Sequence, residues 1–210
     1  MKVLELFAGS RSFSKVAEEH GMETHTSDYK PFKKIDQVCD IFDFDYNKVP
    51  FFPDIIWASP PCTTFSIASC STHWTKKDDK FIPKTDEAKL GLRIVNKTQI
   101  IIDHYIAHNP ELIYIIENPR GLLRKMELMK KYNNNLRTIW YCQYGDTRAK
   151  PTDIWTNANW LPRPVCKNGN PNCHHERAPR GSKTGTQGLG NAYERSKIPE
   201  QLCEEIINDL

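Results

Sequence analysis

Three short apolar runs constrain the fold of this chain more than any other feature. They are Val3-Leu-Glu-Leu-Phe7, Asp54-Ile-Ile-Trp-Ala58 and Leu112-Ile-Tyr-Ile-Ile116, and helical patterns lie between them. Runs this short and this apolar are typical of strands buried on both faces. Their alternation with helices predicts the α/β class, with a Rossmann-like mixed, mostly parallel sheet covered by helices on both faces.

The segments between these runs carry their own signals. Gly9 favours a turn directly after the first strand, and Ser12 and Thr85 can each cap a helix. The expected elements are a turn at 8–10, a helix at 12–20, a strand at 24–27, a polar and mobile loop at 63–84, and an amphipathic helix at 85–109.

Composition restricts the kind of protein. Apolar runs are far shorter than the 18 or so residues of a membrane span, and residues 1–20 alternate apolar and charged side chains unlike a secretory signal. The seven cysteines are odd in number and mostly far apart, which argues against a disulfide framework. We therefore expect a soluble protein inside a cell, with no membrane contact.

Charge is unevenly distributed along the chain. Residues 1–119 hold 14 Lys and Arg against 17 Asp and Glu, whereas residues 120–197 hold 15 against 5. A net charge of +10 in the second stretch suits a polyanion such as nucleic acid. The alternative is a basic surface that is merely solvated.

Cys62 is the candidate nucleophile. It follows the second apolar run behind Pro60 and Pro61, which lack an amide donor and fix φ, so they end strand pairing and stiffen the turn that presents the thiol. The alternative is an inert, buried cysteine. Gly9, Asp28, Asp40 and Glu117 are expected at the same edge, since ligands of parallel sheets bind at the carboxyl ends of the strands.

The ordered motifs resemble the S-adenosylmethionine-dependent DNA cytosine-5 methyltransferases, especially the short members common in bacteriophages. The resemblance covers nearly the whole chain. Its motifs are Phe7-Ala-Gly-Ser10, Asp28, Asp40-Ile41, Ser59-Pro-Pro-Cys62, Glu117-Asn118, Gln143-Tyr-Gly145 with Arg148 and Lys150, and Gly190-Asn191 through Leu202.

The resemblance implies residue roles, a setting in DNA restriction and modification, and a monomer in the cytoplasm of a bacterium or an infected host cell. It assigns catalysis to Cys62, Glu117, Asn118, Arg148 and Lys150. It assigns binding of S-adenosylmethionine to Phe7, Ala8, Gly9, Ser10, Asp28, Asp40, Ile41, Ser59, Pro60, Asn191 and Ser196.

The implied reaction methylates carbon 5 of a cytosine that is flipped out of duplex DNA. The Cys62 thiolate would add to ring carbon 6 while Glu117 supplies a proton at the N3 edge. Asn118 would orient the proline turn or the base. The loop after Cys62 would close over the nucleotide, with His73, Trp74, Lys76 and Lys77 as its candidate contacts.

Two departures from the family stand out. The segment Arg148-Ala-Lys-Pro-Thr-Asp153 lacks one expected arginine, and Asp153 stands near its place. The recognition region is also short, so we expect a catalytic domain at 1–158 and 187–210, a minimal recognition loop at 159–186, and short or relaxed sequence specificity.

The recognition loop contains a possible zinc site. Cys166, Cys173, His174 and His175 supply sulfur and nitrogen ligands, although the usual two close pairs are absent. The alternative is a loop with a free thiol and solvated histidines. Arg177, Arg180 and Lys183 follow and would contact phosphates.

Two other functions remain open at this point. One is the same chemistry on cytidine nucleotides or RNA, which the short recognition loop favours. The other is a catalytically idle DNA-binding protein, which the missing arginine favours and the joint presence of Cys62 and Glu117 opposes. A thymidylate synthase also uses a cysteine at carbon 6, but the Phe7-Ala-Gly turn does not belong to that fold.

Overall fold

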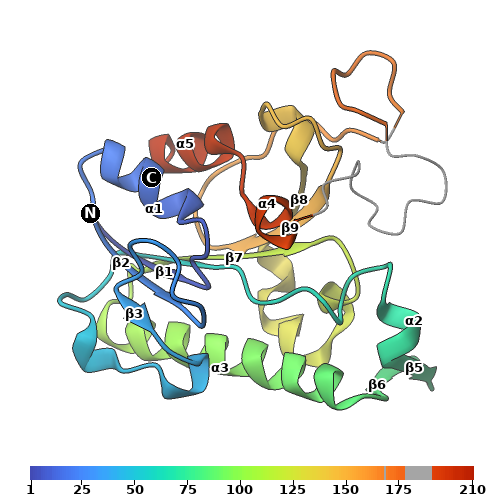
Figure 1. Cartoon of the computed structure of the whole chain (residues 1–210), viewed down its shortest axis with the longest axis horizontal. Helices are drawn as coiled ribbons and strands as arrows, with labels where there is room; N and C mark the ends of the chain where they lie inside the picture. The colour runs from blue at the N-terminus through green and yellow to red at the C-terminus, as the bar shows by residue number, and fades with distance from the viewer. Residues whose placement is uncertain (168, 178–190) are drawn as a thin grey trace.

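A seven-stranded sheet forms the centre of the computed structural model, which describes residues 1–167, 169–177 and 191–210 (Figure 1). The strand order is β3-β2-β1-β4-β7-β9-β8; the first five are parallel, and β9 is antiparallel to both of its neighbours. The expected mixed, mostly parallel sheet is therefore confirmed. The strands are β1 (Lys2–Leu6), β2 (Glu23–Asp28), β3 (Gln37–Val38), β4 (Ile55–Ala58), β7 (Ile113–Pro119), β8 (Leu136–Trp140) and β9 (Pro151–Thr156).

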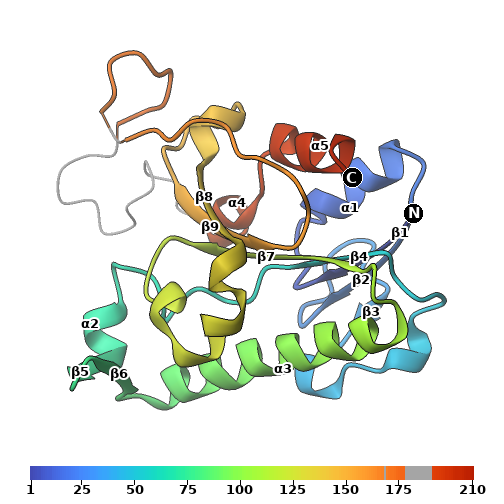
Figure 2. The ribbon, with the colours of Figure 1, turned by 180° about the vertical axis from the view of Figure 1, so that it is seen from behind.

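Helices cover both faces of this sheet (Figures 1 and 2). Helices α1 (Ser12–Glu19) and α5 (Glu200–Asn208) pack on one face, and the long helix α3 (Asp86–His108) packs on the other. Thr85 caps α3 through the amide of Ala88, as expected. The shorter segments are η1 (Ile41–Asp43), η2 (Tyr46–Lys48), α2 (Cys70–His73), η3 (Leu123–Lys125), η4 (Glu127–Asn135), η5 (Tyr141–Tyr144) and α4 (Ala192–Ser196).

The sheet has a hydrophobic core on each face, because side chains alternate between the two faces along each strand. In β4, Ile55 and Trp57 face α1 and α5, whereas Ile56 faces α3. Phe13 of α1 stacks on Trp57 with ring centroids 4.7 Å apart. Both faces of the strand are therefore shielded from water, which is why Ile55–Ala58 contains no polar residue.

The segment after Cys62 corrects one expectation. Instead of a loop without secondary structure, it contains α2 and a two-stranded hairpin of β5 (Trp74–Lys77) and β6 (Lys80–Pro83). Trp74 is buried, donates from Nε1 to the carbonyl of Thr64 at 2.7 Å, and stacks on Phe65. This tryptophan therefore belongs to the core and does not form a contact to nucleic acid, because its indole is already enclosed.

The described part of the expected recognition loop, residues 159–167 and 169–177, has no helix or strand and is fastened to α5 by side chains. Trp160 is fully buried and donates to Glu205 of α5, which also pairs with Arg163. Within the described residues, no helix is both long and apolar enough to span a membrane.

Candidate active site

A cavity of about 510 Å³ lies at the carboxyl ends of β1, β4 and β7. The strand order reverses between β1 and β4, and in open α/β sheets ligands bind at such a point. The predicted residues that line the cavity are Phe7, Ala8, Gly9, Ser10, Ser59, Pro60, Cys62, Glu117, Lys150 and Ser196. The sheet thus brings together residues from five separate segments of the chain.

The turn after β1 has an unusual backbone. Phe7, Gly9 and Arg11 have φ values of 58°, 48° and 57°, so three left-handed residues turn the chain sharply before α1. Asp28 at the end of β2 fixes this turn, because its Oδ2 accepts a hydrogen bond from the Gly9 amide at 2.9 Å. The predicted acidic residue therefore supports the turn directly.

Glu5, which sequence reasoning missed, lies beneath the turn. Its carboxylate accepts hydrogen bonds from the amides of Phe13 and Ser14 at the first turn of α1. Burial raises the pKa of this carboxyl to about 7, despite those hydrogen bonds and nearby Arg11. An acidic residue in the middle of a buried apolar run was the available signal.

The proline turn is fixed from the neighbouring strand. Asn118 of β7 is buried and donates from Nδ2 to the carbonyl of Pro60 at 2.8 Å. The Cys62 carbonyl accepts from the amides of Phe65 and Ser66, both at 3.0 Å. These contacts hold Cys62 at the carboxyl end of β4 with its position set from both sides.

Charges around Cys62 act in opposite directions. Burial raises the pKa of the thiol above its ordinary value, Lys150 lowers it, and Glu117 raises it. The thiol lines the cavity, so a ligand could reach it even though protein encloses most of its surroundings. The balance of Lys150 against burial therefore decides how much of the thiol is ionised.

Glu117 is held by Tyr141, a second residue that sequence reasoning missed. The Tyr141 hydroxyl donates to Oε1 of Glu117 at 3.0 Å, and Lys150 Nζ lies 3.8 Å from the same oxygen. The ammonium group of Lys150 also lies 4.5 Å from the centre of the Tyr141 ring. One carboxylate oxygen of Glu117 is thus fixed by two groups, one from η5 and one from the residue directly before β9.

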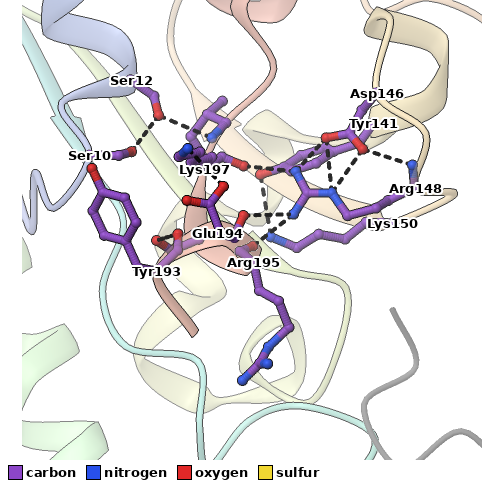
Figure 3. A network of polar contacts seen from close by, with 12 residues as sticks. Ser10, Ser12, Tyr141, Asp146, Arg148, Lys150, Tyr193, Glu194, Arg195 and Lys197 are labelled. Atoms are coloured by element: carbon purple, nitrogen blue, oxygen red, sulfur yellow. Dashed lines mark hydrogen bonds and ion pairs between the residues drawn. The ribbon is translucent and has the colours of Figure 1, made fainter. Parts of the chain in front are cut away.

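Arg148 contributes to the site without lining the cavity. It pairs with Asp146 and donates to the carbonyls of Arg195 and Lys197 at 2.9 and 3.1 Å (Figure 3). The amide of Ile198 in turn donates to the hydroxyl of Ser12 at 3.1 Å. These bonds fasten the last part of the chain over the turn after β1 and bring Ser196 to the cavity.

Four residues that were expected to bind the cofactor do not line this cavity. Asp28 holds the turn, Asp40 caps η1 by accepting from the Phe42 amide at 3.0 Å, and Ile41 is buried. Asn191 caps α4 by accepting from the Tyr193 amide at 2.9 Å. Their role toward a cofactor stays a prediction.

Asp153, which stands near the place of the expected arginine, is fully buried and paired. Its Oδ2 accepts from Nε of Arg124 at 2.7 Å, and its Oδ1 accepts from the Thr138 hydroxyl at 3.0 Å. In the β7–β9 register it is the partner of Asn118. The residue therefore has a structural ion pair next to the strand that carries the site.

A cluster of cysteine and histidine side chains, called the second cluster below, lies beside the cavity. Cys142, Cys166, Cys173 and His175 each point one ligand atom inward, and these atoms all lie within 4.8 Å of one another. The cluster differs from the expected metal-ligand set, because it includes Cys142 and leaves out His174, whose Nε2 lies 3.1 Å from the carbonyl of Asp146. The predicted phosphate contacts Arg180 and Lys183 lie outside the described residues.

Comparison with known proteins gives a similarity over the full length of the chain. No family model matches the sequence. The chain is 29% identical over 228 residues to the "Probable DNA (cytosine-5)-methyltransferase" of Frog virus 3 (isolate Goorha), and the match covers 99% of both chains. Among solved structures, a triple mutant of Spodoptera frugiperda DNMT2 matches with a TM-score of 0.46 and 16% identity, over 79% of this chain and 56% of that one.

Proposed function

We propose that this protein transfers a methyl group from S-adenosylmethionine to carbon 5 of cytosine in DNA. The observation that carries the proposal is that Cys62 and Glu117 line the same cavity as the turn after β1. Full-length similarity to a viral protein with that probable activity supports it. The catalytic part would comprise residues 1–158 and 187–210.

The cavity suits a ligand of nucleoside size. Its volume of about 510 Å³ falls within the usual range for small-molecule sites. A Cβ atom at Gly9 would have no neighbour closer than 3.9 Å, so the missing side chain leaves the backbone open to a ligand. S-adenosylmethionine would supply an electrophilic methyl group, and its binding residues would be those predicted at 7–10, 28, 40–41, 59–60, 191 and 196.

Each side chain at the cavity would have its own role in the reaction. The Cys62 thiolate adds to carbon 6 of cytosine while Glu117 delivers a proton to N3, which makes carbon 5 nucleophilic. After carbon 5 has taken the methyl group, its proton passes to solvent and the bond between carbon 6 and sulfur breaks with its electron pair on Cys62. N3 returns its proton to Glu117, which restores both the aromatic ring and the starting state of the two side chains. Lys150 favours the thiolate, and Tyr141 keeps Glu117 in place.

DNA is the substrate that the charge distribution favours. Arg120, Lys150 and Arg195 line the cavity, and a net charge of +10 over residues 120–197 suits a phosphate backbone. The target base would have to leave the duplex to reach Cys62. Because the recognition segment is short, we expect contacts to few base pairs and short or relaxed specificity.

Transfer of labelled methyl groups tests the proposal. Purified protein is incubated with S-adenosylmethionine and, separately, duplex DNA, single-stranded DNA, transfer RNA and dCMP. Label in DNA that Cys62→Ala abolishes is the expected result. Cys70→Ala is the matched control, because Cys70 is a partly exposed cysteine of the same segment that does not line the cavity.

The other outcomes separate the remaining alternatives. Label only in RNA or dCMP would keep the chemistry and overturn the substrate. Binding of DNA without label, and without covalent trapping on DNA that carries 5-fluorocytosine, would indicate an idle DNA-binding protein, because fluorine cannot leave carbon 5 as a proton does.

A further inference from the structure

Two distant segments contribute the cysteine and histidine side chains of the second cluster. Cys142 belongs to η5, directly after β8, whereas Cys166, Cys173 and His175 belong to the recognition segment. Their ligand atoms all lie within 4.8 Å of one another. The fold therefore closes a four-ligand set that no single segment of the sequence contains.

The spacing of these atoms fits one tetrahedral ion. With Zn–S bonds of about 2.3 Å and Zn–N bonds of about 2.0 Å, tetrahedral geometry separates neighbouring ligand atoms by about 3.5 to 3.8 Å. Cys166 Sγ lies 3.8 Å from Nδ1 of His175. Small shifts of side chains would bring all four atoms onto such an ion.

The chemistry of the set favours a structural zinc ion. Three sulfurs and one imidazole nitrogen are a common structural zinc set, and a site with four protein ligands leaves no position for water or substrate. Three of the four residues are buried, and all three cysteines are free of disulfides. A hard cation such as Mg²⁺ would require oxygen ligands, which this set lacks.

Amide groups around the sulfurs favour the ionised form that a metal requires. Gln143 Nε2 lies 3.8 Å from Cys142 Sγ and 3.7 Å from Cys173 Sγ, and Asn170 Nδ2 lies 3.6 Å from Cys166 Sγ. N–H groups that face metal-bound sulfur stabilise its negative charge. A shell of donors is therefore already present around three thiols.

We propose that Cys142, Cys166, Cys173 and His175 bind one zinc ion, which fastens the recognition segment to η5. Binding releases the three thiol protons to solvent. With zinc on Nδ1, the ring proton of His175 moves to Nε2, so the hydrogen bond that Nε2 now accepts from the Gly169 amide is lost. The four protein ligands replace that single contact.

The position of the ion gives it a specific consequence. Cys142 directly follows Tyr141, whose hydroxyl holds Glu117. The recognition segment also reaches this region through hydrogen bonds, among them those from the Arg163 amide to the Tyr144 hydroxyl at 2.9 Å and from the Glu176 amide to the Thr147 carbonyl at 2.8 Å. Zinc would thus position the recognition segment against the same turn that orients Glu117.

Metal content of the full-length protein tests the site. The protein is purified without chelator, saturated with zinc, desalted, and measured by elemental analysis and native mass spectrometry. We expect about one zinc ion per chain, falling to near zero in Cys142→Ser and His175→Ala. His174→Ala is the matched control: it removes the neighbouring imidazole, which lies on the Asp146 carbonyl, and should keep the metal.

A second measurement uses the unmodified chain, so it does not depend on whether variants fold. Thiols are alkylated with and without zinc and identified by peptide mass spectrometry. Zinc should protect Cys142, Cys166 and Cys173, and leave the reactivity of Cys70 unchanged. Absence of zinc from the saturated protein, or retention of zinc in Cys142→Ser together with its loss in His174→Ala, would overturn the proposal. Neither measurement depends on methyl transfer.

Discussion

Asn118→Ala should uncouple the proline turn from the strand beside it. Its Nδ2 is the hydrogen-bond donor to the Pro60 carbonyl at 2.8 Å, and both residues are buried. In the variant this buried carbonyl loses its donor, which costs about 1 to 3 kcal/mol in the free energy of unfolding. The turn that aims Cys62 would then be held from one side only.

The effect on catalysis should exceed the effect on folding. A misplacement of reacting groups by about 1 Å can cost about 100-fold in rate, which corresponds to about 2.7 kcal/mol of activation free energy. We therefore expect kcat for methyl transfer to fall by about two orders of magnitude, with KM for S-adenosylmethionine nearly unchanged. Asn118 does not line the cavity, so it would act through the position of Cys62.

Asn157→Ala is the matched control. Asn157 follows β9 and accepts from the Tyr114 amide at 2.9 Å and donates to the Leu112 carbonyl at 2.8 Å, at the opposite end of β7. Its loss should lower stability to urea without changing kcat. If both variants retain kcat, or if both lose it in proportion to their stability, the proposed positioning role of Asn118 is refuted.

Three further changes test the electrostatics and packing of the site. Lys150→Met removes the cation that lowers the pKa of Cys62, so the pH at which methyl transfer reaches half its maximum should rise, whereas Lys150→Arg should keep the wild-type profile. Burial raises the pKa of Glu5 from 4.5 to about 7, so between these pH values the folded state binds a proton that the unfolded state does not. The free energy of unfolding should therefore fall by about 3 kcal/mol as pH rises through this range. Urea titrations at pH 4.5 and 8 should show this decrease in the wild type and not in Glu5→Gln. Gly121→Ala would place a Cβ 2.4 Å from the Phe65 carbonyl oxygen and should lower the free energy of unfolding by about 1 to 3 kcal/mol. An unchanged melting temperature would contradict this close packing.

The sheet and its edge could be predicted because each depends on short-range patterns. The apolar runs at 3–7, 54–58 and 112–116 became β1, β4 and β7, and Thr85 begins α3 where its hydroxyl can cap the helix. The proline pair had to end a strand, since proline lacks the amide that pairing requires. Cys62 and Glu117 therefore had to emerge at one edge, and both line the cavity there.

The features that the sequence could not reveal depend on how strands far apart in the sequence pair in the sheet. The antiparallel pairing of β8 and β9 places Trp140 opposite Pro151, which sets the position of the η5 turn. Neither Tyr141 nor Cys142 has a local pattern that points to Glu117 or to a cysteine cluster in a segment more than twenty residues later. In the same way, the partner of Asp153 is Arg124, on a different segment.

Arg148 and Lys150 have different surroundings in this arrangement. Arg148 and Lys150 both contact the Tyr141 ring, with charge centres 5.3 and 4.5 Å from its centroid. The guanidinium group of Arg148 donates to Asp146 and to the carbonyls of Arg195 and Lys197. A planar group with five donors suits this set of acceptors. Lys150 instead brings a compact ammonium group to 3.8 Å from Glu117 in the lining of the cavity. The two cations therefore have separate tasks, and Lys150 is the one that can act on the ionisation of Cys62.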